Sequence, residues 1–217
     1  MPLRLYDYAA SANCLKVRLL LAHLGREYER VPVDIFDGDT LTDEFAALNP
    51  ARSTPVLELE SGEHLQESNA ILVYLADGTK LIPDQPFDRA QVLRWLFFEQ
   101  ADLVPAIGGL RFRLITGRIA PDGPATERRR AAGHDVLRLL DGHLSERDFM
   151  VAGRFSAADI GIYGYTHVAP EAGIELAPYP AVRAWIERVE TQSGHLNDLE
   201  PYPPNAQAGV SRSIYDR

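Results

Sequence analysis

The feature that most constrains the fold of this 217-residue chain is a strand, a helix and a second strand within its first 33 residues. Residues 3–7 and 28–33 have the short apolar pattern of strands. Between them an apolar stripe recurs at helical spacing and ends at Gly25, a residue type favoured just after a helix. The stripe consists of Val17, Leu20, Leu21 and Leu24, and the polar residues off it are Lys16, Arg18 and His23. A helical crossover joins parallel strands, so the chain is predicted to begin with a parallel βαβ unit.

The next segment completes a small mixed α/β domain. The predicted elements are a helix over 43–48, strands over 56–60 and 63–66 joined by the turn Ser61-Gly62, and a helix that begins at Ser68. The predicted order from the N-terminus is therefore βαβαββα, and we place this domain at residues 1–78.

After residue 78 the pattern becomes helical throughout. A Pro-, Gly- and Asp-rich stretch at 79–88 is predicted to be a linker, followed by an all-helical domain at 89–200. The expected helices are a long one over 87–118, bent near Pro105, and three more over 127–144, 155–168 and 181–191. The prolines of 201–217 predict an irregular C-terminal tail.

Composition excludes several classes of function. A net charge of −9 disfavours binding to nucleic acid and to anionic membranes. The N-terminus has no signal-peptide pattern, and no apolar run approaches the roughly 20 residues of a membrane span. A single cysteine excludes an internal disulfide and a multi-cysteine metal site. A cytoplasmic protein without a structural metal is expected.

Three short motifs have the chemistry of a small-molecule site, although each also has a purely structural interpretation. Ser11 and Asn13 lie at a strand-to-helix turn, where they either cap the helix or donate hydrogen bonds to a thiolate. Pro55 directly precedes a strand. If its peptide bond is cis, the backbone of Val56 is available to an extended peptide ligand; the alternative is an ordinary trans turn.

The third motif is Glu67-Ser68 at a predicted helix start. Ser68 can hold a carboxylate and Glu67 an ammonium group, which together fit the zwitterionic head of an amino acid. The alternative is a simply capped helix. A fourth pattern, Ser156 with Asp159, has capping-box spacing, flanked by Phe155 and Ile160 as a hydrophobic staple, and is assigned a folding role only.

The order and spacing of these motifs over roughly residues 3–195 resemble the cytosolic glutathione transferase superfamily. The segments that carry the resemblance are Leu5-Tyr6-Asp7-Tyr8, Ser11 to Arg18, Thr54-Pro55-Val56, Glu67 to Ile71, Trp95 to Gln100 and Ser156-x-x-Asp159. Bacterial members often have similar first, second and fifth segments. The resemblance implies a thioredoxin-like glutathione-binding domain followed by a helical bundle.

The resemblance also implies roles for individual residues. Ser11 matches the serine that hydrogen-bonds the glutathione sulfur in theta- and zeta-like classes, and Asn13 an asparagine used in some nu-like members. The glutathione-binding residues it implies are Thr54, Pro55, Val56, Glu67 and Ser68. Ser53 stands where many relatives have Lys or Arg beside the glycine carboxylate, and Arg52 or His64 is the candidate replacement. Leu110, Phe112 and Arg113 are candidates for an electrophile pocket.

Cys14 is the alternative nucleophile, because cysteine serves in beta- and omega-like relatives. Their cysteine falls nearer position 11 or 13, and Cys14 shares a helix face with Val17 and Leu21, so it is expected to point into the core as a packed small residue.

The expected function is conjugation of glutathione, as co-substrate, to a small apolar electrophile by a homodimer. The alternatives are a glutathione-dependent disulfide or peroxide reductase, which Asn13 favours, and a non-catalytic ligand-binding protein.

Overall fold

The computed structural model describes residues 2–216, and these residues divide into two units. One unit is formed by the chain up to Leu75 together with the segment from Leu196, and the other by Ala76–His195.

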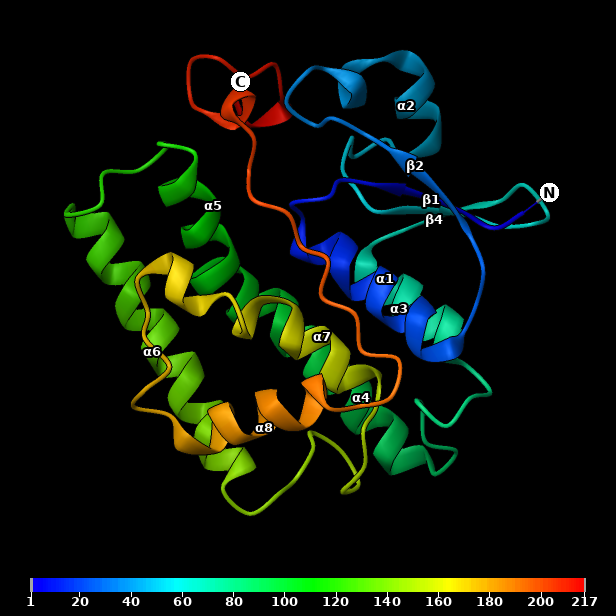
Figure 1. Ribbon diagram of the computed structural model, residues 1–217, viewed down its shortest axis with the longest axis vertical. Helices are drawn as coiled ribbons and strands as arrows, with labels where there is room; N and C mark the ends of the chain where they lie inside the picture. Colours follow the sequence, from blue (N-terminus) through cyan, green and yellow to red (C-terminus); the bar gives the residue numbers. More distant parts are fainter. Residues whose placement is uncertain (1, 217) are drawn as a thin grey trace. The chain divides into compact units, whose positions relative to one another are not determined.

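The first unit contains a four-stranded sheet in the order β2-β1-β3-β4 (Figure 1). Its elements are β1 (Arg4–Asp7), α1 (Ala12–Leu24), β2 (Glu29–Pro32), the short 3-10 helix η1 (Asp39–Leu41), α2 (Asp43–Leu48), β3 (Val56–Glu58), β4 (His64–Gln66) and α3 (Ser68–Ala76). β1 pairs in parallel with β2 and antiparallel with β3, and β3 pairs antiparallel with β4. The predicted βαβαββα order, including its parallel beginning, is confirmed.

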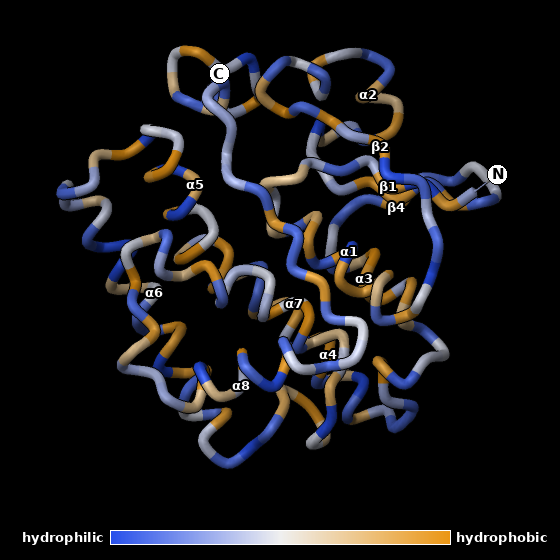
Figure 2. Tube along the Cα trace, in the orientation of Figure 1, coloured by the Kyte–Doolittle hydropathy of each residue, from blue (hydrophilic) through white to orange (hydrophobic). Residues whose placement is uncertain are grey.

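Helix α1 is buried more completely than its apolar stripe suggests. Nine of its residues are buried, and Figure 2 shows apolar residues concentrated along α1 and α3. Lys16 and Arg18 lie off the apolar stripe and are nevertheless buried, both with 0% exposure. Lys16 Nζ donates to Asn69 Oδ1 on α3 at 3.2 Å, and Arg18 Nη1 donates to the Asp7 carboxylate at the end of β1. Burial of their charges is offset by these polar partners, which periodicity alone does not reveal.

The second unit is helical. It contains α4 (Pro86–Phe98), the π-helical segment η2 (Glu99–Gly108), α5 (Gly109–Ile115), α6 (Pro124–Leu144), α7 (Ala157–Thr166), the 3-10 helix η3 (Ala169–Ala172) and α8 (Pro180–Glu190). The single helix expected over 87–118 is thus three consecutive segments, with Pro105 inside the π-helical one. Proline has no N–H and its ring displaces the preceding turn, which an α-helix cannot accommodate without a local change of pitch. No described helix is long and apolar enough to cross a membrane.

The predicted capping box of α7 is confirmed. The Asp159 carboxylate has 0% exposure and accepts four hydrogen bonds at 2.9 Å. The donors are Met150 N, Ser156 N, Ser156 Oγ and Trp185 Nε1. Burial raises the pKa of Asp159 to about 6, against the effect of these donors. The link to α8 through Trp185 was not predicted, since local spacing cannot show a partner 26 residues away.

The C-terminal segment packs within the first unit. In Figure 1 it runs, orange to red, past α1 and ends near the loop before α2. Two short 3-10 helices, η4 (Pro204–Ala206) and η5 (Ile214–Asp216), interrupt the tail that was expected to be irregular.

Replacing Asp159 with asparagine tests the packing of α7. The amide nitrogen places a donor against at least one buried donor, so we expect Asp159→Asn to lower the free energy of unfolding by about 2–4 kcal/mol. Urea unfolding followed by circular dichroism measures this. Asp148→Asn, the same change at an exposed carboxylate, is the control and should leave the midpoint unchanged. An Asp159→Asn midpoint equal to that of the control would contradict the assignment.

Candidate functional site

The register of the sheet brings the three sequence motifs together at one end of its strands, which we call the sheet edge. Tyr6 of β1 lies opposite Val56 of β3, and Val56 lies opposite Gln66 of β4. The chain leaves β1 just after Tyr6, enters β3 at Val56 and leaves β4 at Gln66. In antiparallel pairing, the C-terminal ends of β1 and β4 lie beside the N-terminal end of β3. The turn before α1, the segment before β3 and the start of α3 therefore all meet at this edge.

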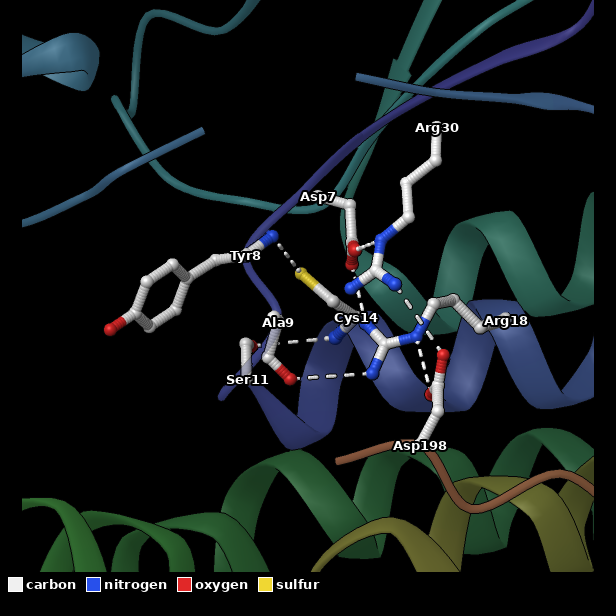
Figure 3. A network of polar contacts seen from close by, with 8 residues as sticks. All are labelled: Asp7, Tyr8, Ala9, Ser11, Cys14, Arg18, Arg30 and Asp198. Carbon is white, nitrogen blue, oxygen red and sulfur yellow. Dashed lines mark hydrogen bonds and ion pairs between the residues drawn. The ribbon is translucent and has the colours of Figure 1, made fainter. Parts of the chain in front are cut away.

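The turn before α1 presents Ser11 at the helix N-cap (Figure 3). The Ser11 N–H donates to Tyr8 O at 3.0 Å, and Ser11 Oγ accepts from the Cys14 N–H at 3.4 Å. In this contact the hydroxyl oxygen is the acceptor, so the hydroxyl proton is left to donate to a ligand. Ser11 and Asn13 are both half-buried. The capping and ligand-binding interpretations of Ser11 are therefore compatible.

The segment before β3 has a cis peptide bond between Thr54 and Pro55, so of the two alternatives that the sequence leaves open, the structure has the cis one. The Thr54 side chain lies near the Cys14 thiol of α1 and lowers its pKa slightly, against the larger effect of burial. Pro55 and Val56 are buried. The backbone of residues 54–56 is thereby held next to the Ser11 turn.

The start of α3 completes the edge. Glu67 has φ 68°, in the left-handed region, and its side chain is exposed. A non-glycine residue in this conformation is uncommon and often marks a functional site. Ser68 is 3% exposed, and its hydroxyl donates to Asn13 Oδ1 at 3.4 Å. Two helix N-termini therefore lie together, a local environment that favours negative charge. The Asn13–Ser68 contact was not predicted, and no sequence signal indicates it.

The residues predicted to lie beside the glycine carboxylate of the ligand contact other residues of the protein. Arg52 Nη1 donates to the carbonyls of Thr40 at 3.0 Å and Thr42 at 2.8 Å. Ser53 Oγ accepts from Asn49 Nδ2 at 3.2 Å. His64 Nε2 lies 3.9 Å from a carboxylate oxygen of Glu58. Holding a ligand carboxylate remains a prediction for Arg52, Ser53 and His64.

Cys14 lies in the core, as its helical phase predicted. It has 0% exposure, and its sulfur accepts from the Tyr8 N–H at 3.4 Å. Burial raises the pKa of the Cys14 thiol to about 12, and the nearby Asp7 carboxylate adds to the shift. The thiol is therefore neutral at pH 7, and a neutral thiol is a poor nucleophile.

The residues proposed for an electrophile pocket belong to the second unit. Leu110 is fully buried there, Arg113 Nη1 donates to Gly109 O at 2.9 Å, and the Arg118 guanidinium lies 5.2 Å from the Phe112 ring centre. Their role as a pocket stays a prediction. Among residues 2–216, no group of three or more His, Cys, Asp or Glu is arranged to hold a metal ion.

Comparison with known families gives two matches. The model of the glutathione S-transferase N-terminal domain matches residues 10–77, and that of the glutathione S-transferase C-terminal domain matches residues 103–193.

Individual relatives agree with these matches. A glutathione S-transferase of Pseudomonas fluorescens is 41% identical, with a TM-score of 0.88, covering 92% of this chain and 100% of that one. A glutathione transferase of Burkholderia graminis, solved with two glutathione molecules per subunit, is 28% identical with a TM-score of 0.81, covering 91% and 87%. Disulfide-bond oxidoreductase YfcG of Escherichia coli is 29% identical over 85% of this chain and 89% of its own length.

The state of Cys14 is testable by alkylation. With a thiol pKa near 12 and no exposed surface, native protein at pH 8 should resist iodoacetamide, because its thiolate fraction is about a thousandfold below that of a free thiol. Intact mass spectrometry counts the added groups, and urea-unfolded protein is the positive control with its single cysteine. Equal rates of labelling in native and unfolded protein would restore Cys14 as a candidate nucleophile.

Proposed function

Because this chain belongs to the glutathione S-transferase superfamily, we propose that it binds glutathione at the sheet edge and activates its thiol for attack on a small apolar electrophile. The observation that carries the proposal is the meeting of Ser11, the cis Thr54–Pro55 segment and the Glu67–Ser68 helix start in one place.

The three segments suit different parts of the glutathione molecule. Ser68 at the N-terminus of α3 receives the γ-glutamyl carboxylate, and the exposed Glu67 accepts from the γ-glutamyl ammonium. Val56 pairs through its backbone with the cysteinyl residue of glutathione, in the manner of an added strand. Arg52 and Ser53 are the candidates beside the glycine carboxylate.

The sulfur of a ligand held in this way lies at the Ser11 turn. A free thiol has a pKa of about 8.5, so about 3% is thiolate at pH 7, and lowering the pKa by two units requires about 2.7 kcal/mol. One hydrogen bond to a charged acceptor supplies about 1.5–3 kcal/mol, and the helix N-terminus adds about 0.3–1 kcal/mol. A hydrogen bond from Ser11, with or without Asn13, is therefore sufficient for activation.

The chemical step follows from the thiolate. The sulfur lone pair forms a carbon–sulfur bond with the electrophile, and the leaving group departs with its bonding electrons. The Ser11 hydrogen bond stabilises the thiolate before the attack and weakens as sulfur loses its charge. Ser11 therefore acts mainly by raising the thiolate fraction of the bound ligand.

A second candidate function is glutathione-dependent reduction of a disulfide. Asn13 lies beside Ser68 at the same edge, and the similarity to an Escherichia coli disulfide-bond oxidoreductase favours this chemistry. Here the thiolate attacks a disulfide sulfur, which forms a mixed disulfide and releases the other sulfur as a thiolate; a second glutathione thiolate then attacks the glutathione sulfur of the mixed disulfide, which forms glutathione disulfide and releases the second substrate thiolate. A non-catalytic glutathione-binding protein is the third possibility, against which the complete set of Ser11, Pro55, Glu67 and Ser68 argues.

Assays of wild type with an aryl halide and with a small disulfide, after retention on immobilised glutathione, separate the three functions. Retention without turnover of either substrate would support the non-catalytic alternative.

Two serine-to-alanine variants test the roles within the site. Ser11→Ala removes a hydrogen bond to the thiolate, so the pKa of the bound thiol should rise by about one to two units and kcat at pH 7 should fall about tenfold or more. The loss should shrink at higher pH, because the thiol then ionises unaided. Thiolate absorbance of the bound glutathione against pH measures the shift.

Ser68→Ala is the matched control. It removes a contact to the far end of the ligand, so KM should rise while kcat is spared. A thiol pKa unmoved by Ser11→Ala, together with inactivity of Cys14→Ser, would show a cysteine-type enzyme instead.

We also propose that the protein is a homodimer. Helix α4 carries two strongly exposed aromatic side chains, Phe87 at 65% and Phe97 at 71%. An exposed apolar surface can mark a site of contact with another subunit. Asp102, exposed in the adjoining η2, is the candidate to reach the partner's glutathione amine; Gln100 is a second, whereas Glu99 is fully buried.

Sedimentation at micromolar concentration tests the dimer. Wild type should sediment at twice its chain mass of 24.1 kDa, and Phe97→Asp should shift it towards the monomer because a charge then opposes burial of this face. Leu139→Asp, the same change at an exposed apolar residue of α6, is the comparison. A 24.1 kDa wild-type particle would refute the dimer.

A further inference from the structure

A closed ring of four charged side chains lies beside the turn that carries Ser11 (Figure 3). The Asp7 carboxylate contacts Arg18 Nη1 at 2.5 Å and also contacts Arg30 Nε. Asp198, from the C-terminal segment, contacts Arg18 Nε at 2.8 Å and Arg30 Nη1 at 3.5 Å. The two carboxylates and two guanidinium groups balance in charge.

Two members of the ring are buried and two are partly exposed. Arg18 and Asp7 have fully buried side chains, whereas Arg30 and Asp198 are 35% and 33% exposed. A buried ion is costly unless it is paired and hydrogen-bonded. Without Asp198 the two guanidinium groups would share a single carboxylate, and Arg18 would lose its Nε partner.

The C-terminal segment also touches the turn directly. We call residues 196–216 the C-terminal strap. The strap's Glu200 N–H donates to Ala9 O at 3.2 Å, and Arg18 Nη2 lies 3.4 Å from the same oxygen. Ala9 lies two residues before Ser11. The carbonyl of this residue is therefore held by both the ring and the strap.

Aromatic packing adds a contact at the preceding residue. Tyr8 is 6% exposed, and its ring lies 5.7 Å from that of Phe36 and 6.2 Å from that of Tyr202 on the strap. Tyr8 provides the carbonyl that accepts from the Ser11 N–H and the N–H that donates to Cys14. The strap thus contacts the backbone and side chains on which the Ser11 cap depends.

Beyond Tyr202 the strap stays attached to the same unit. Asn205 Nδ2 donates to Asp34 Oδ2 at 2.8 Å, and the Arg212 N–H donates to Phe36 O at 2.8 Å. Ala206 is fully buried. The strap is therefore held to the unit by contacts both before and after its contact with the turn.

We propose that Asp198 is a positioning residue for the thiol site: through Arg18, it and the strap fix the Ala9 carbonyl and hold Ser11 in the orientation that stabilises a bound thiolate. The inference rests on the proposed function of Ser11. Its action is indirect, because Asp198 touches the arginines of the ring and not the ligand. Besides its four members, the titratable groups that interact with the ring are Cys14 and Tyr28, and Glu200 on the strap interacts with Tyr8.

The test compares three variants of the full chain. Asp198→Asn removes the charge, Asp198→Glu restores it, and Glu200→Gln removes an equal charge from an exposed side chain two residues away on the strap. Two readouts are measured on each: hydrogen exchange of the Ser11 and Cys14 amides in the free protein, and the pKa of bound glutathione from its thiolate absorbance.

For Asp198→Asn we expect exchange of both amides to be about fivefold faster or more, because the turn opens more often. The pKa of the bound thiol should rise by about 0.5–1 unit. At pH values below that pKa, kcat should therefore fall about threefold to tenfold, with little change in KM. Asp198→Glu should recover much of both effects, and Glu200→Gln should resemble wild type. Urea unfolding of each variant shows whether it remains folded under assay conditions.

The outcomes separate the two proposals. Unchanged exchange in Asp198→Asn overturns the inference about the strap. Faster exchange with an unmoved thiol pKa shows a structural role only and also overturns it. A wild type that binds glutathione without lowering its thiol pKa overturns the proposed function of Ser11, whatever the exchange data show. Equal effects of Asp198→Asn and Glu200→Gln would trace the change to net charge and not to position.

Discussion

The antiparallel pairing of β1 with β3 and of β3 with β4 is the constraint on which the candidate site depends. It aligns Tyr6, Val56 and Gln66 across the sheet, so three segments separated in sequence meet at one edge. A shift by one residue would reverse the facing of every side chain on the moved strand. The site therefore needs the register as much as the residue types at its edge.

The same edge carries a concentration of charge that the first 75 residues cannot balance by themselves. Asp7 at the end of β1 draws in two arginines, and the remaining carboxylate comes from Asp198, 180 residues beyond Arg18. Burial makes these charges expensive to leave unpaired, so docking of the C-terminal strap stabilises the first unit. The charges of the N-terminal domain are thus balanced by a carboxylate from the C-terminal end of the chain.

This separation marks the limit of prediction from the sequence. The βαβαββα order, the phase of Cys14 and the Ser156–Asp159 capping box follow from local periodicity and spacing, and the structure has all three. The burial of Arg18 could not be predicted, because its hydrophilic side chain is drawn inside by partners far away in sequence. The contacts of Ser68 with Asn13 and of Trp185 with Asp159 are long-range in the same way.

The different roles proposed for Ser11 and Cys14 also follow from geometry at short range. Ser11 and Cys14 are three residues apart and hydrogen-bonded through the Cys14 N–H, yet they face opposite environments. Ser11 caps the helix and stays half-buried at the edge, whereas Cys14 has already entered the core, where burial and Asp7 both disfavour its thiolate. The buried Cys14 supplies no reactive thiolate at pH 7, so in the proposed function the reactive sulfur belongs to the ligand. Because Cys14 is not a thiolate, it does not occupy the positive N-terminal ends of α1 and α3. These ends remain available to a thiolate and a carboxylate of one ligand molecule.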